Sequence, residues 1–204
     1  MKILIKIIIF LIIIPSKSFS LIEVDITRGN LDPLPIAVSP LSIDENSRQN
    51  FEKILEKKNI GNEISKIIEV NLKTSGLFNP LNKDAFLQAP DIANLKPRFE
   101  DWNLIKAQAL ITGKVSYIDE KLRVEFRLWD VLAGKEMVAL AFTTVPTNWR
   151  RVGHIITDKV YQRLTGEKGY FDTRIIYVAE EGPKTKRIKK PVSYTHLTLP
   201  TKVT

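Results

Sequence analysis

The sequence predicts an α+β domain in which two main helices pack on one face of a mixed, mostly antiparallel sheet of about five strands, preceded by a signal peptide. Two segments carry apolar residues at helical spacing, and Gly76 and Gly166 stand just past their ends, where a left-handed residue closes a helix. Between them, residues 107–145 alternate apolar and polar side chains and turn at Asp119 and Glu120. This alternation is typical of an antiparallel meander with one wet face.

Each predicted helix has boundary signals of its own. The first follows Gly61, and Asn62 is expected to cap it. The second is expected to be capped by Thr147 or Asn148. The residues expected to form the buried stripes are Ile64, Ile67, Ile68 and Leu72 in the first helix, and Trp149, Gly153, Ile156, Val160 and Leu164 in the second.

The strands differ in how clearly they are signalled. Residues 121–132 give the strongest pattern, with Leu122, Val124, Phe126 and Leu128 on one face. "IAVS" (36–39) lies among prolines and is expected to be an edge strand. "TRIIYVA" (173–179) is expected to be the last strand. Residues 42–61 fit a weak helix or a surface loop, and residues 82–100 appear in the sequence as irregular chain that ends in one short helical turn.

The N-terminus has the three-part layout of a secretory signal. A basic start is followed by the apolar run Ile7 to Ile14, by Pro15, and by small residues at Ser18 and Ser20. The run is too short for a membrane-spanning helix, which needs about 20 apolar residues. We therefore expect residues 1–20 to be a signal peptide cleaved near Ser20-Leu21, and the mature protein to be exported and not embedded in a membrane.

The net charge of +8 does not indicate nucleic-acid binding, because the bases lie mostly at the two ends. Residues 1–20 hold three lysines and residues 183–204 hold six bases, without acids, so residues 21–182 have a net charge of −1. A nucleic-acid site needs bases clustered on one face of a domain. Cysteine is absent, which excludes disulfides, thiolate metal sites and cysteine nucleophiles.

No pattern in the sequence predicts catalysis, a metal site or a cofactor. The two histidines are His154 and His196, too few for a histidine metal centre. His154 has no accompanying nucleophile motif and is expected to be a half-buried residue hydrogen-bonded within the helix packing. The acidic pairs lie in a turn and in a polar exit segment, the glycines form no phosphate loop, and the three tryptophans are scattered over different elements. We expect no enzyme.

Two blocks carry a resemblance to a known family. "RRVGHIITDKVYQRLTGEKGYFDTRIIYV" (150–178) resembles the stretch that joins the N-terminal domain of the TolB family to its β-propeller, and "IIEVNLKTSGLFNPL" (67–81) resembles the helix-to-strand passage of the same domain. The resemblance covers residues 21 to about 181. It implies a non-enzymatic periplasmic interaction protein of the Tol–Pal system, which supports outer-membrane integrity and invagination during division. The alternative is a periplasmic small-ligand- or lipid-binding domain.

The resemblance also implies a division of the chain. Residues 33–172 would be the TolB-like domain, and residues 173–182 the start of a linker or first propeller strand. The family binds Pal through the propeller, which we expect to be missing from this chain. Residues 183–204 are expected to be an unstructured and artefactual tail, because "PVSYTHLTLPTKVT" lacks core periodicity and resembles nothing in the family.

Residues 21–32 are expected to bind a partner. "LIEVDITRG" alternates like a strand and precedes prolines that prevent a tight hairpin with "IAVS". From the residues alone, it could add to another protein's sheet edge or complete the sheet of its own domain. The family resemblance favours the C-terminal domain of TolA as the partner. The expected partner-binding residues are Leu21, Ile22, Glu23, Val24, Asp25, Ile26 and Thr27.

Overall fold

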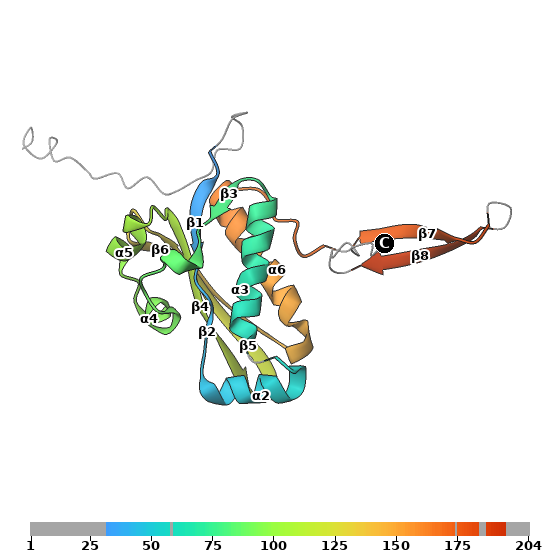
Figure 1. The fold of residues 1–204 in the computed structure, drawn as a ribbon, viewed down its shortest axis with the longest axis horizontal. Helices are drawn as coiled ribbons and strands as arrows, with labels where there is room; N and C mark the ends of the chain where they lie inside the picture. Colours follow the sequence, from blue (N-terminus) through green and yellow to red (C-terminus); the bar gives the residue numbers. More distant parts are fainter. Residues whose placement is uncertain (1–31, 58, 174, 184–186, 195–204) are drawn as a thin grey trace, which may run out of the picture.

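The computed structural model describes residues 32–57, 59–173, 175–183 and 187–194. Its main body is a six-stranded mixed sheet, covered on one face by two long helices (Figure 1). The strand order is β3-β1-β4-β5-β6, and the short β2 pairs with β4 beside this path. The predicted α+β class is confirmed. The expected signal peptide and the segment Leu21–Thr27 lie outside the described residues.

The bounds of the elements follow the sequence patterns with a few shifts. The strands of the main sheet are β1 Leu34–Val38, β2 Ser42–Ile43, β3 Phe78–Pro80, β4 Ala109–Ile118, β5 Lys121–Asp130 and β6 Lys135–Thr144. The helices are α2 Glu45–Leu55, α3 Ile60–Thr74, α4 Pro90–Leu95, α5 Phe99–Leu104 and α6 Trp149–Thr165, with short 3₁₀ turns at Lys83–Ala85 and Pro146–Asn148.

The meander β4-β5-β6 confirms the prediction from alternation. Both of its strand pairs are antiparallel, and the β4–β5 turn places Asp119 and Glu120 at φ 50° and 58°. Two consecutive left-handed residues match the twist of a tight hairpin. The expected inward face of β5 is buried, because none of its four residues exceeds 1% exposure: Leu122, Val124, Phe126 and Leu128.

The expectation that "IAVS" forms an edge strand is wrong. β1 lies inside the sheet, parallel to β3 on one side and to β4 on the other, and Ile36 is fully buried. Pro35 is tolerated because the pairing with β4 begins only at Ile36, so the missing N–H of the proline leaves no gap in the ladder. The carbonyl of Pro35 still accepts a hydrogen bond from the backbone N–H of Gln108 (2.9 Å).

The expected cap of the first long helix is also corrected. α3 begins at Ile60, and Asn59 caps it by accepting a hydrogen bond from the N–H of Asn62 (3.1 Å). Gly61 is therefore inside the helix. A Cβ atom there would stand 2.2 Å from the carbonyl oxygen of Leu41, so the close approach of this chain requires glycine.

The second long helix confirms its predicted stripe. All five residues expected to be buried in α6 are buried, and Gly166 ends the helix at φ 76°. Asn148 stands at the N-cap, but its side chain donates to Thr144 Oγ1 (3.0 Å) instead of capping the helix. The α3 and α6 stripes pack with the inward faces of β1, β4 and β5 in one core cluster.

Two further regions contain helices, one that the sequence left open and one for which the prediction of irregular chain is wrong. Residues 42–61 contain α2, which Asp44 caps by accepting from the N–H of Ser47 (2.8 Å) and which buries Phe51 completely. Residues 82–100, expected to be irregular, contain α4. A second, smaller core gathers around Trp102, whose Nε1 donates to Gln88 Oε1 (3.1 Å).

The last described strands do not join the main sheet. β7 (Ile175–Glu181) pairs with β8 (Ile188–Tyr194) as an antiparallel two-stranded sheet, which Figure 1 shows projecting from the main body. The sequence predicts no regular structure in residues 183–204, whereas residues 188–194 form the strand β8. β8 is held by backbone pairing to β7 and by ion pairs such as Lys190–Glu181 (2.9 Å), which need no apolar face.

Candidate partner-binding surface

The candidate surface arises where the helical layer ends before the sheet does. β6 is an outer strand of the sheet, and its Val138, Leu140 and Phe142 share the helix-facing side with the apolar residues of β5. Phe126 on β5 is 1% exposed, whereas its neighbour Leu140 on β6 is 41% exposed. The helices thus cover β5 and leave part of the same face of β6 open.

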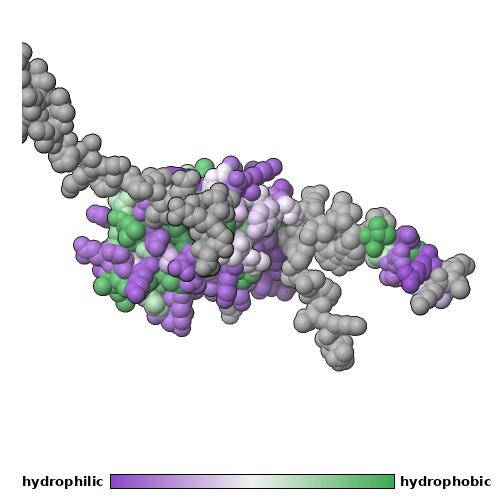
Figure 2. Space-filling view, turned by 90° about the horizontal axis from the view of Figure 1, so that it is seen from above, coloured by the Kyte–Doolittle hydropathy of each residue, from purple (hydrophilic) through white to green (hydrophobic). Residues whose placement is uncertain are grey.

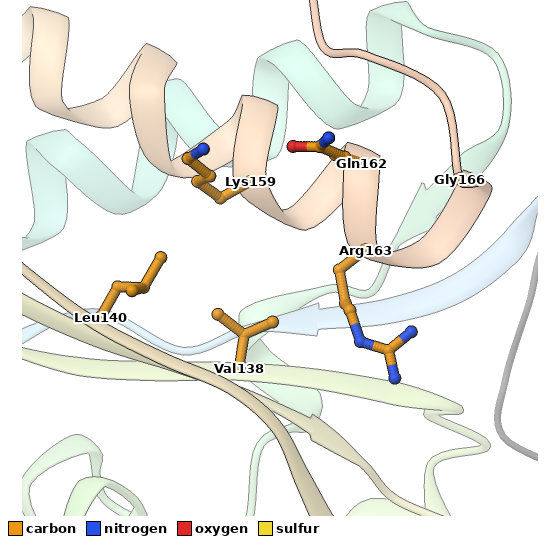
Figure 3. A pocket seen from close by; sticks show the side chains of 6 residues that line it. All are labelled: Val138, Leu140, Lys159, Gln162, Arg163 and Gly166. Atoms are coloured by element: carbon orange, nitrogen blue, oxygen red, sulfur yellow. The ribbon is translucent and has the colours of Figure 1, made fainter.

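An open groove of about 390 Å³ occupies this uncovered strip between β6 and the C-terminal half of α6. Figure 3 shows Val138 and Leu140 directed from β6 toward the helix, and Arg163 extending from α6 toward the sheet. The apolar floor therefore comes from the strand and the polar rim from the helix. The lining residues are Val138, Leu140, Lys159, Gln162, Arg163 and Gly166.

The rim of the groove is cationic. Lys159 is exposed and Arg163 is half-buried, while no carboxylate lines the groove. Neither cation makes an ion pair within the described part of the chain. Figure 2, a view from above, shows hydrophobic residues in small groups among hydrophilic ones. The groove combines an apolar floor with two cations that are available to an acidic ligand.

The backbone of β6 adds a second feature to this surface. Among the residues that the structure describes, no strand pairs with β6 on its outer side. Residues 137–144 of this strand are uncharged, and Ala139 and Ala141 on its wet face are small and exposed. Edge strands without charge, proline or cover are available for pairing with another chain.

The sequence-predicted partner-binding residues cannot be placed on this surface. Leu21, Ile22, Glu23, Val24, Asp25, Ile26 and Thr27 all lie outside the described residues. Sequence reasoning missed Lys159 and Arg163, because bases on the polar side of an amphipathic helix are indistinguishable from an ordinary solvated face. The alternation of apolar residues in β6 was the only sequence signal for this surface. It predicts that one face of the strand is buried, but it does not show where the covering helices end.

His154 occupies the structural position that the sequence predicted. Its Nδ1 lies 2.9 Å from Asn71 Nδ2, and the same amide donates to Thr157 Oγ1 (3.2 Å). The hydrogen bonds join α3 to α6 within their half-buried interface. The prediction of a histidine bonded within the helix packing is confirmed.

Ionisable groups are dispersed over the described residues. No three potential metal ligands among them come together. The pKa of Tyr161 is raised chiefly by burial, in the aromatic cluster it forms with Tyr170 and Phe171. Trp102, Trp129 and Trp149 belong to different elements, as expected. Among the described helices, none has both the length and the apolarity needed to cross a bilayer.

The fold and this surface define a class: a two-layer α+β domain that presents an open groove beside a free strand edge. The chain belongs to the TolB amino-terminal domain family, whose model matches residues 22–137. It is similar to the Tol-Pal system protein TolB of Pelagibacter ubique (strain HTCC1062), with 80% identity over 182 residues, which is 89% of this chain and 41% of the relative.

A solved structure shows the same fold. The crystal structure of TolB from Acinetobacter baumannii superposes with a TM-score of 0.62 at 21% identity, over 87% of this chain and 40% of that one. The chain thus spans about two fifths of the length of the relatives it matches. Family membership confirms the resemblance that was based on residues 67–81 and 150–178. It also confirms that the resemblance concerns only the N-terminal part of TolB.

Proposed function

We propose that this chain is the amino-terminal part of a periplasmic, non-enzymatic interaction protein of the Tol–Pal system, supporting outer-membrane integrity and invagination during cell division. The observation that carries the proposal is the 80% identity to a protein named as a Tol-Pal system protein, together with the family match. Chains that are 80% identical over 182 residues adopt the same fold over that range.

The proposed partner-binding element is the segment Leu21–Thr27. Its alternation of apolar and acidic residues suits addition to a sheet edge of the C-terminal domain of TolA, where backbone hydrogen bonds give affinity and alternate side chains give selectivity. The described residues begin at 32, five positions after Thr27, and β1 is anchored on both sides in the sheet. Such an anchor supports a role of the folded body as a fixed base for the segment.

Pal binding belongs, in this proposal, to the propeller of the family and to no residue described here. The ligand- or lipid-binding alternative would need a large apolar cavity between the helices and the sheet. In the described part of the chain, that space holds the main core cluster, which includes Ile68, Phe126 and Val160. The interaction role therefore has the better support.

The test is a calorimetric titration of the C-terminal domain of TolA with the chain and with a variant lacking Leu21–Thr27. We expect binding by the chain and none by the variant, with unchanged circular dichroism. Equal binding by both would refute the assignment of the segment. Loss of the circular dichroism signal of the folded state in the variant would instead show that the segment is part of its own domain's sheet.

A further inference from the structure

We propose that the outer edge of β6, together with the groove beneath α6, binds an extended segment of a partner protein whose helix-facing residues alternate between apolar and acidic. This surface consists of described residues only. It is separate in sequence from Leu21–Thr27, so the proposal stands or falls independently of TolA binding.

The backbone geometry of β6 permits an added strand. It is an outer strand of the sheet, ten residues long, and its charges, Lys135 and Glu136, lie at its beginning. A bulge lies at that same end, where the register with β5 shifts between Leu128 and Trp129. Charges and bulges are devices that protect edges from pairing. Residues 138–144 have neither, so this stretch offers unprotected N–H and C=O groups.

The groove specifies the side chains of the added strand. Alternate residues of a strand point to the same face, and those on the helix side of the added strand would stand beside Val138 and Leu140. Apolar side chains there would cover the exposed part of Leu140. Its burial would remove apolar area from water at a site where the domain supplies no cover of its own.

The rim specifies the charge of the partner. Lys159 and Arg163 are one helical turn apart on α6, so both extend along the same flank of the groove. On the added strand, an acidic residue and an apolar residue two positions apart would point to the same face. The acidic one would contact these cations, and the apolar one would contact Val138 and Leu140. On the opposite side, Ala139 and Ala141 leave space for small polar side chains.

A second copy of this chain is a poorer occupant of the edge. Antiparallel pairing of two β6 strands follows a twofold axis perpendicular to the sheet, which places both α6 helices on the same side. Lys159 and Arg163 of one copy would then face those of the other. Like charges placed opposite each other oppose association, so the charge pattern favours an acidic partner over self-pairing.

The probe is an acetylated and amidated peptide, VTETVTETV, which has valine and glutamate on one face and threonine on the other. Its matched control is VTKTVTKTV. Binding of labelled peptides is measured by fluorescence anisotropy at low salt. We expect the glutamate peptide to bind at least about tenfold more tightly than the lysine peptide. The double variant Lys159→Glu/Arg163→Glu, checked for folding by circular dichroism, should reverse this preference. Equal binding of both peptides would overturn the proposal.

Two peptides with N-methyl groups on alternate residues separate strand pairing from simple charge attraction. One carries them on the odd residues and the other on the even residues. An added antiparallel strand uses only one set of amides toward β6, so one peptide should lose binding while the other retains it. Equal affinities would contradict edge pairing. If the chain dimerises in sedimentation experiments and Lys159→Glu strengthens the dimer, the edge binds a second copy. Peptide binding only by a chain lacking residues 21–27 would assign it to the chain's own segment, and either result overturns the proposal.

Discussion

Gly153 on α6 lies so close to Ile67 on α3 that a Cβ atom at position 153 would stand 2.9 Å from Ile67 Cγ2. The same added atom would be 3.1 Å from Ile67 Cβ and 3.5 Å from the carbonyl oxygen of Ile64. The neighbouring atoms belong to a β-branched side chain, which strongly prefers one rotamer in a helix, and to the backbone. Neither can move aside at little cost. Glycine therefore sets the distance between the two main helices.

This contact predicts that Gly153→Val destabilises the domain by about 1–3 kcal/mol, the usual cost of overpacking a core. The measurement is chemical denaturation followed by circular dichroism. Lys66→Val is the matched control, because it places the same β-branched residue at an exposed site in the middle of α3. Valine has a better helix propensity than glycine, so propensity cannot cause a loss at position 153. A loss in Gly153→Val no larger than that in Lys66→Val would contradict the importance of the contact with Ile67.

Phe126 should be a main determinant of stability. It is 1% exposed in the centre of β5, and its ring stacks on Phe142 with centroids 6.1 Å apart. Truncation of such a residue typically costs about 3–5 kcal/mol, a large part of the total stability of about 5–15 kcal/mol of a domain. Phe126→Ala should therefore largely unfold the chain in a thermal melt.

The adjacent residue provides the control for that melt. Arg127 points to the opposite face of β5, where it pairs with Glu136 (3.3 Å) and donates to the carbonyl oxygen of Asn94 (3.3 Å). Pairs of this exposure contribute about 0–1 kcal/mol. Arg127→Ala should leave the fold intact, and equally mild effects of both substitutions would mean that Phe126 is not central to the core.

Gln88 should hold the α4–α5 region together. It is 4% exposed, donates to the carbonyl of Lys96 (3.0 Å), and accepts from the N–H of Arg98 (3.0 Å) and from Trp102 Nε1 (3.1 Å). Gln88→Leu keeps the volume but removes the partner of the Lys96 carbonyl, the Arg98 N–H and the buried Nε1 of Trp102. The cost is about 1–3 kcal/mol for each group that water does not reach.

Hydrogen exchange measured by mass spectrometry tests this role. Faster exchange is expected in residues 90–104, with the meander unchanged, because the smaller core around Trp102 is separate from the main one. Gln49→Leu, on the exposed side of α2, is the control. Unaltered exchange in residues 90–104 would show that Gln88 is dispensable.

Asp44 should link stability to pH. The backbone hydrogen bond from Ser47 is the main cause that lowers the pKa of Asp44, aided by the Ser47 hydroxyl and Lys114. A group whose pKa is lower in the folded state stabilises fully above its unfolded value and loses this contribution as pH falls through the folded value. As an N-cap residue, Asp44 should cost about 0.5–2 kcal/mol when replaced by alanine.

The expected result is a lower melting temperature of Asp44→Ala near neutral pH, with a gap to the unsubstituted chain that narrows between about pH 5 and pH 2. The gap is measured by parallel melts at several pH values. A gap that stays constant or widens on acidification would contradict the assignment of Asp44 as a charged cap.

The sequence predicted best those elements whose pattern is local. The faces of β5 follow from alternation within ten residues, and the α6 stripe follows from spacing within one helix. Asn59 and Asn62 are three residues apart and both can cap a helix, so the sequence could not distinguish them. In the structure Asn59 is the cap, and Gly61 in the first turn lies against the carbonyl of Leu41, a contact that no local pattern predicts.

The errors arose where a distant partner decides the outcome. Pro35 indicates an edge strand only if the neighbouring strand needs its N–H, and the pairing with β4 begins one residue later, between Ile36 and Ala109. The groove beside β6 depends on the width of the helical layer relative to the sheet, which no local pattern encodes. Lys159 and Arg163 became notable only after the fold placed them over exposed apolar residues.

The central position of β1 has a consequence for the order of folding. As the chain is made from its N-terminus, β1 appears early, yet its parallel partner β4 follows only after α2, α3 and the α4–α5 region. The hairpins β4-β5 and β5-β6 close over short loops and can form quickly, whereas closing the long loop between Ile36 and Ala109 is slow. We expect the meander to form first and β1 to enter last, so that the parallel β3-β1-β4 part of the sheet forms only when folding is nearly complete.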